Sequence, residues 1–159
     1  MLDLEKDSVC LTDSSGDRIG GVIVVESDGS YPTFTFSTKL EEFPLIKDLS
    51  INVKEYFAAI VGVVKRTTLV KNAGSADENC TQMIDNRAGQ VWLASQKVSL
   101  YKREIAVLAK IMQCFQVTFQ DRFFFHRIST TQNWAADAAS RMVPNSETLN
   151  FAAINVYEL

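Results

Sequence analysis

The apolar segments of this chain follow a strand pattern in its first third and alternate between helix and strand patterns after it. This change of pattern limits the possible fold more than any other feature. Residues 8–12, 20–26 and 31–37 are rich in β-branched and aromatic side chains, and short turn-forming segments separate them. Neighbouring strands joined by so few residues pair antiparallel. We therefore predict that the first third of the chain forms a three-stranded meander.

Strand and helix patterns alternate in the rest of the chain. Strands are predicted at residues 80–84 and 122–128, and helices at residues 53–66, 87–96, 100–115 and 133–142. Ser50 and Asn52 offer N-cap chemistry for the first of these helices. Strands separated by helices pair in parallel through crossovers. The chain is thus expected to form an α/β fold, with a five-stranded mixed sheet flanked by helices, strands 1 to 3 antiparallel and strands 4 and 5 parallel.

Length and composition favour one domain. The chain has 159 residues, of which 47% are hydrophobic, which is enough for one core and short for two. We expect the domain to span residues 1–143 and leave residues 144–159 as an unassigned tail. No apolar run approaches the roughly 20 residues that cross a bilayer, and no secretory signal is visible, so we expect a cytoplasmic or nuclear protein that does not bind membranes.

The cysteines and the charge distribution give two further expectations. Cys10, Cys80 and Cys114 lie in apolar runs without the spacing of a disulfide framework or a zinc site, which favours reduced thiols. A net charge of −3 is not typical of a protein that binds nucleic acid by bulk electrostatics. Residues 1–48 are mainly acidic, however, whereas residues 54–127 contain more bases than acids. One part of an acidic protein could therefore still face phosphates.

The helix predicted at residues 53–66 has two adjoining stripes. The first is apolar and is predicted to be buried; it consists of Val53, Tyr56, Phe57, Ile60 and Val64. The second combines one acid with small residues, namely Glu55, Ala58, Ala59 and Gly62. Small residues let a helix approach a sheet closely, which would direct the carboxylate of Glu55 at a strand end. On this helix alone, a solvated surface role for Glu55 is the favoured interpretation.

Two other acids occupy equivalent places in the predicted sheet. Asp13 follows the apolar residues 9–12, and Asp85 follows residues 83–84. Side chains at strand ends of an α/β sheet reach a crevice while the backbone stays rigid, so an acid at each of two strand ends is a candidate metal site. Taken alone, Asp13 is as consistent with a turn aspartate that accepts backbone hydrogen bonds.

Four motifs together resemble a known family. They read Leu-Thr-Asp-Ser-Ser-Gly-Asp at residues 11–17 with Gly-Gly-Val at 20–22, Asn-Val-Lys-Glu at 52–55, Ile-Asp-Asn-Arg-Ala at 84–88, and Asn-Trp-Ala-Ala-Asp-Ala-Ala-Ser-Arg at 133–141. In this order they resemble the ribonuclease H domain of retroelement reverse transcriptases, of the LTR or DIRS-like class. Each motif alone is weak, but four in order, over residues 8–142, form a fairly specific signal.

The resemblance implies a fold, a site and an activity. It implies a ribonuclease H-like fold in which four carboxylates bind metal and act in catalysis, Asp13, Glu55, Asp85 and Asp137. Asn86 and Asn133 are implied to support the site. The implied cofactor is Mg²⁺ or Mn²⁺, as two ions, and clustered carboxylates suit such hard cations. The implied reaction is hydrolysis of the RNA strand of an RNA–DNA hybrid, beside a polymerase domain in the parent polyprotein.

Substrate contacts and the histidine are further expectations. A hybrid is sensed by its shape and its 2′-hydroxyls, through hydroxyl and basic groups. The candidates here are Ser14, Ser15, Lys97, Lys102 and Arg103, although the basic residues are also consistent with a solvated helix face. Many family members place a histidine in the loop before the last acid. The single histidine, His126, instead lies on the predicted strand 122–128, so both a supporting catalytic role and a packed or edge position remain open.

Two other readings stay open. The first is a ribonuclease H-fold module that binds or scaffolds nucleic acid without cutting it, although that role does not require four acids. The second is a related nuclease or transposase on the same fold that acts on DNA. The early meander and the pattern of residues 133–141 favour the retroelement family over the second reading.

Overall fold

The computed structural model describes residues 7–25, 33–72, 79–85, 103–119 and 122–141. The strands are β1 (Asp7–Ser14), β2 (Arg18–Val24), β3 (Thr33–Lys39), β4 (Asn79–Ile84) and β5 (Arg122–Arg127). The helices are α1 (Ile51–Asn72), α3 (Arg103–Phe119) and α4 (Trp134–Arg141), with a short 3-10 turn at Leu40–Glu42. The helix predicted at residues 87–96 lies outside the described residues. No helix in the described ranges is long and apolar enough to cross a membrane.

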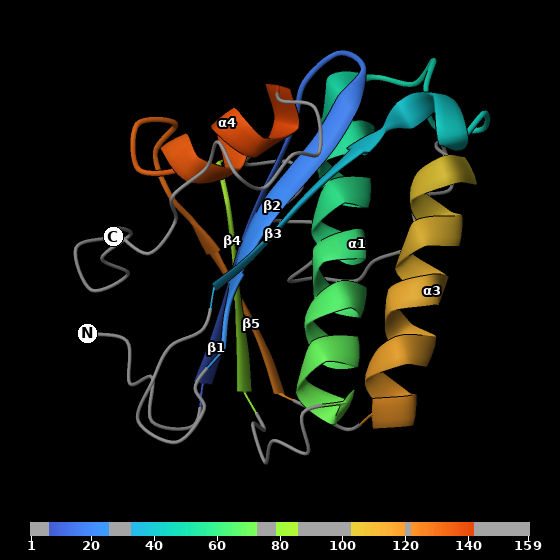
Figure 1. Cartoon of the computed structure of the whole chain (residues 1–159). Helices are drawn as coiled ribbons and strands as arrows, with labels where there is room; N and C mark the ends of the chain where they lie inside the picture. The colour runs from blue at the N-terminus through green and yellow to red at the C-terminus, as the bar shows by residue number, and fades with distance from the viewer. Residues whose placement is uncertain (1–6, 26–32, 73–78, 86–102, 120–121, 142–159) are drawn as a thin grey trace.

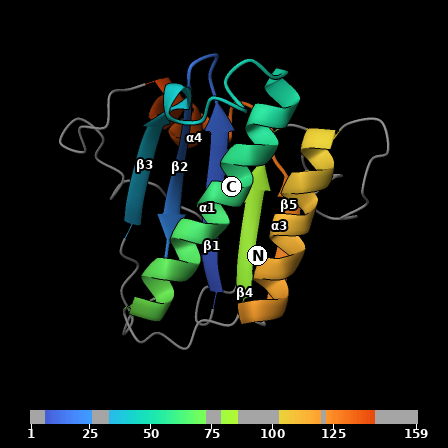
Figure 2. The same ribbon diagram turned by 90° about the vertical axis from the view of Figure 1, so that its right-hand side faces the viewer.

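The strands form one mixed sheet in the order β3-β2-β1-β4-β5. β1, β2 and β3 pair antiparallel, as their short connections predict, whereas β1 pairs parallel with β4 and β4 pairs parallel with β5. Helices α1 and α3 run side by side over one face of the sheet, and α4 crosses the other face near one end of the strands (Figures 1 and 2). The predicted mixed sheet flanked by helices is confirmed.

Helix α1 is longer than predicted and packs with a different face toward the sheet. Ser50 is its N-cap, because the Val53 amide donates to the Ser50 hydroxyl at 3.5 Å. Val53, Tyr56 and Ile60 are buried as predicted, but Val64 is 37% exposed and Val63 is buried in its place. The prediction for Val64 was wrong because the buried face includes the stripe of small residues as well as most of the apolar stripe, which leaves Val64 at its border.

The small residues of α1 are what lets the helix lie close to the sheet. A Cβ atom at Gly62 would stand 2.6 Å from Cγ2 of Thr12 and 2.7 Å from Sγ of Cys10, both on β1. Ala58 and Ala59 are completely buried on the same helix. The predicted close approach of this helix to the sheet is therefore confirmed, and it fixes where the neighbouring Glu55 emerges.

Helix α4 lies equally close to the other face. A Cβ atom at Gly20 on β2 would stand 2.3 Å from the backbone nitrogen of Ser140 and 2.5 Å from the carbonyl carbon of Ala139. Gly20 pairs with Asp13 across β1 and β2, so the contact lies beside the predicted site. The alanines of α4 then complete an apolar cluster with the sheet: Val9, Leu11, Val22, Val24, Met83, Ile128, Ala135 and Ala136.

We predict that Gly20→Ala destabilises the protein by about 1 to 3 kcal/mol, because the new methyl group would meet backbone atoms that have no alternative rotamer. Gly16→Ala is the matched control: a Cβ atom there has nothing within 4 Å, and the change should stay within about 0.5 kcal/mol. Chemical denaturation of both variants measures the difference. Equal stabilities would contradict the close packing of α4 on β2.

Candidate metal centre

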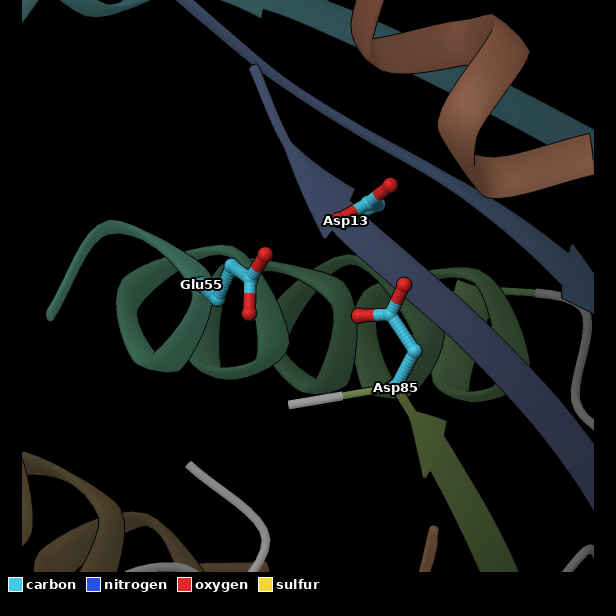
Figure 3. Close-up of side chains that lie close together, drawn as sticks. All are labelled: Asp13, Glu55 and Asp85. Carbon is cyan, nitrogen blue, oxygen red and sulfur yellow. The ribbon is translucent and has the colours of Figure 1, made fainter. Parts of the chain in front are cut away.

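Three carboxylates converge at the end of the sheet where β1 and β4 finish. Asp13 lies near the end of β1, Asp85 directly follows β4, and Glu55 comes from the beginning of α1. One oxygen atom of each lies within 4.8 Å of the others. Figure 3 shows the three side chains directed at a common space between the strand ends and the helix. The strand-end argument thus brings together Asp13 and Asp85, and Glu55 joins them from the helix.

Strand pairing sets the relative position of the two aspartates. β1 and β4 are parallel neighbours in which Thr12 pairs with Ile84, so Asp13 and Asp85 each follow paired residues and lie at the same level. The Gln82 side-chain amide donates to the Thr12 hydroxyl at 2.8 Å in the buried layer directly below. The register of these two strands is therefore fixed both by the backbone ladder and by a buried side-chain hydrogen bond.

The loop after β1 is held in place by internal hydrogen bonds. The Ser14 amide donates to Oδ1 of Asp13 at 2.8 Å, which orients that carboxylate. The Ser15 hydroxyl donates to the Ser140 carbonyl at 2.7 Å, and the Lys54 ammonium donates to the Gly16 carbonyl at 2.9 Å. Sequence reasoning missed the role of Lys54, although its place next to Glu55 in the sequence puts it beside this loop.

Helix α4 supplies the fourth predicted acid, at the edge of the group. Asn133 anchors the start of the helix to β1, because its Nδ2 donates to the Thr12 carbonyl at 3.1 Å. Asp137 lies one turn further on and forms an ion pair with Nε of Arg141 at 3.1 Å. Asp137 is not among the three acids that share the 4.8 Å space, but its charge acts on both Asp13 and Asp85.

Crowding of the acids makes their ionised forms unfavourable. Burial, followed by the charge of Asp85, raises the pKa of Asp13 from 3.8 to about 7, although the Ser14 amide acts in the opposite direction. Burial and the charge of Asp137 also raise the pKa of Asp85, while hydrogen bonding with Asn133 and the charge of Arg127 lower it. A cation among these groups would relieve the repulsion.

The donor set fits a hard divalent cation. All three members of the cluster offer carboxylate oxygens, the ligand type that Mg²⁺ and Mn²⁺ prefer, and the group contains neither sulfur nor imidazole. The Oδ1 atom of Asn133 is buried and accepts no hydrogen bond from the described residues, so a polar acceptor lies beside the same acids. The residues present therefore fit the metal that the sequence resemblance implied.

The remaining predicted site residues lie in several places. Ser14 and Ser15 are close to the cluster, but their hydroxyls donate to backbone carbonyls within the protein. His126 lies on β5, paired with Met83, and is exposed. Arg103 is the first residue of α3. The last group lies outside the described residues: Asn86, Lys97 and Lys102.

Arg127 is a second residue that sequence reasoning did not assign to the site. It ends β5, and its Nε donates to the backbone carbonyl of Asp85 at 3.4 Å. A basic side chain at this point balances part of the negative charge of the cluster, as its lowering of the pKa of Asp85 indicates. The sequence feature that could have indicated this role is a basic residue at the end of β5, the strand next to β4 in the sheet.

Comparison with known proteins identifies the fold. No family model and no curated protein matches the sequence. Among solved structures, the N-terminal RNase H domain of rv2228c from Mycobacterium tuberculosis, solved as a fusion with maltose binding protein, matches with a TM-score of 0.57 at 15% identity, over 85% of this chain and 96% of that one. RNase H1 from the archaeon Halobacterium salinarum matches with a TM-score of 0.56 at 15% identity, over 84% and 92%.

A third solved structure was determined with a nucleic acid. LC11-RNase H1, isolated from compost by a metagenomic approach, was solved in complex with an RNA/DNA hybrid. It matches with a TM-score of 0.57 at 11% identity, over 84% of this chain and 91% of that one. At these identities the matches establish the fold, which is ribonuclease H-like, and the predicted fold class is confirmed.

We predict that the metal-free protein loses stability as the pH rises from about 4 to about 7. In this window the folded state keeps a proton on Asp13, whose pKa is raised from 3.8 to about 7, whereas the unfolded chain has released it, so ionisation favours unfolding. Melting temperatures in EDTA should therefore fall across this range, and less steeply for Asp13→Asn. Mg²⁺ should raise the melting temperature more at pH 8 than at pH 5.

Asp48→Asn is the control for this pH dependence, because it removes an exposed acid outside the cluster. It should follow the wild-type curve. A wild-type slope retained in Asp13→Asn would contradict the placement of Asp13 among the repelling carboxylates.

Proposed function

We propose that this chain is a divalent-metal-dependent endonuclease that hydrolyses the RNA strand of RNA–DNA hybrids. The observation that carries the proposal is the convergence of Asp13, Glu55 and Asp85 within 4.8 Å at the strand ends of a ribonuclease H-like sheet. The solved complex of LC11-RNase H1 with an RNA/DNA hybrid supports this choice of substrate. The four sequence motifs, which resemble retroelement ribonuclease H domains, support it independently.

The proposed role of each residue follows from its position. Asp13, Glu55 and Asp85 would hold Mg²⁺ or Mn²⁺, and Asp137 would complete the set from α4. When bound, such ions would supply Lewis-acid chemistry, which activates a water and stabilises the charge on the oxygens of a phosphodiester. Asn133 holds α4 against β1 and hydrogen bonds with Asp85, so its proposed role is to position ligands. Asn86, which directly follows Asp85 in the sequence, is proposed to support the site.

Substrate contacts are proposed for two groups of residues. The loop that contains Ser14 and Ser15 would approach the sugar-phosphate backbone through its main chain, because its hydroxyls are already engaged. Lys97, Lys102 and Arg103 are proposed to contact the duplex. The exposed His126 on β5 is proposed as an auxiliary group for proton transfer or product release.

We further propose that the protein acts as the ribonuclease H part of a reverse transcriptase, beside a polymerase domain, in the cytoplasm or nucleus. The support is the sequence resemblance to LTR or DIRS-like retroelements. Within the chain, residues 1–143 would be the ribonuclease H domain and residues 144–159 a tail.

We predict that the purified protein cleaves the RNA strand of a labelled hybrid with Mg²⁺ and does not cleave it in EDTA. Asp13→Asn and Asp85→Asn should each lower the rate by about 100-fold or more, which corresponds to about 3 kcal/mol of transition-state stabilisation. Asp17→Asn is the matched control, because Asp17 is an exposed acid of the adjoining loop outside the three-carboxylate group, and its activity should be close to that of the wild type.

Other outcomes of this experiment have definite meanings. Hybrid binding without cleavage, with either Mg²⁺ or Mn²⁺, would show a binding or scaffold module. Cleavage of duplex DNA would instead show a nuclease or transposase that acts on DNA. In either case the proposed activity would be wrong.

A further inference from the structure

Helix α4 has a second face whose residues border the carboxylate cluster. Its inner face is buried against β1 and β2 and consists of Ala135, Ala136, Ala139 and Ser140. The outer face carries Trp134, Asp137 and Arg141, which follow each other at spacings of three and four residues and so lie in a row along the helix. Asp137 belongs to this row and also acts on Asp13 and Asp85, so the row adjoins the cluster.

Trp134 is unusually exposed for its residue type. Its relative exposure is 51%, although tryptophan is highly buried on average in folded proteins. None of the apolar clusters formed by the described residues includes it. Packing among the described residues therefore does not explain why a large aromatic ring stands at this position.

The backbone under Trp134 is fixed. The preceding residue, Asn133, is buried and donates to the Thr12 carbonyl at 3.1 Å, and the Asn133 amide donates to the Ser129 carbonyl at 3.0 Å. The Asp137 amide donates to the Asn133 carbonyl at 3.0 Å and closes the first turn. Trp134 is thus held on a rigid support about 5 Å along the helix from Asp137.

We infer that Trp134 stacks its indole ring against a sugar of the substrate strand, next to the phosphate that the metal centre would hold; this inference rests on the proposed function. Metal ions held by the carboxylates would bind a phosphate but offer nothing to the sugar beside it. The bases of a hybrid are paired and stacked inside the duplex, so an exposed indole reaches the sugar face of a strand, and this contact selects no sequence. A ring carried on a fixed backbone beside the cluster would help to fix the direction in which the strand crosses it.

The first experiment measures steady-state cleavage of an RNA–DNA hybrid by Trp134 variants. Trp134→Leu should raise KM about 5-fold or more, with a smaller effect on kcat, because the aromatic contact with the sugar is lost while the carboxylates stay in place. Trp134→Tyr should restore most of the affinity, because it keeps an aromatic face. Unchanged melting temperatures would show that both variants are folded.

Phe34→Leu is the matched control. Phe34 is also a strongly exposed aromatic residue, at 40%, but it lies on β3 at the opposite edge of the sheet from β5, and it pairs with Ile23 well below the level of Asp13. Its loss should leave KM unchanged. An equal rise of KM in both variants would assign the effect to general loss of exposed apolar surface and would overturn the inference.

The second experiment detects stacking without cleavage. The chain has two tryptophans, Trp92 and Trp134, so Trp92→Phe leaves Trp134 as the single indole. Combined with Asp85→Asn to prevent cutting, this variant should show quenching of its fluorescence when the hybrid is added. Trp134→Leu in the Asp85→Asn background should lower the affinity for the hybrid about 5-fold or more.

The two experiments separate failure of this inference from failure of the proposed function. Cleavage by the wild type, with an unchanged KM in Trp134→Leu and no quenching, would overturn the stacking role and leave the nuclease proposal intact. Quenching and a loss of affinity without any wild-type cleavage would support stacking in a module that binds hybrids but does not cut them. Failure to bind the hybrid at all would overturn both.

Discussion

The site depends on how closely two helices approach the sheet. On one face, Gly62 lets α1 contact Thr12 and Cys10 directly, and on the other face Gly20 lets α4 rest its backbone on β2. A side chain at either position would push the helix away from the sheet. Because Glu55 and Asp137 are carried on these helices, such a shift would move them away from the ends of β1 and β4. The small residues therefore position the acids by setting how closely each helix approaches the sheet.

The clustered acids lower the stability of the fold that brings them together. Burial and mutual repulsion raise the pKa values of Asp13 and Asp85, so at neutral pH part of the packing energy of the sheet and its helices is spent on holding like charges together. Asp137 adds to this repulsion and is itself paired with Arg141, whereas the charge of Arg127 reduces the repulsion at Asp85. The cluster is therefore better explained by the proposed cation site than by any contribution to the stability of the protein.

Sequence patterns predicted the fold and part of the site for identifiable reasons. Short connections and alternating helices predicted the mixed sheet, and the strand ends predicted Asp13 and Asp85. The helical spacing of the large apolar residues wrongly predicted that Val64 of α1 is buried. That spacing does not show that the helix also packs on the sheet through its small residues. Sequence patterns also could not place Asp137 at the edge of the group, since that depends on the packing of α4 on Gly20, a contact between residues far apart in the sequence.

The buried polar layer under α1 explains why the strand ends coincide. Thr12 and Gln82 are completely buried and joined by a hydrogen bond, and Arg66, also completely buried, donates to the hydroxyl of Ser8 on the same strand. Apolar side chains would fill this layer with at least equal stability, but they would not distinguish one register of β1 and β4 from another. A slip of one residue would turn Asp85 to the opposite face of the sheet. The Thr12–Gln82 pair, which joins β1 and β4 in this register, therefore helps to keep Asp13 and Asp85 level, and the site follows from that alignment.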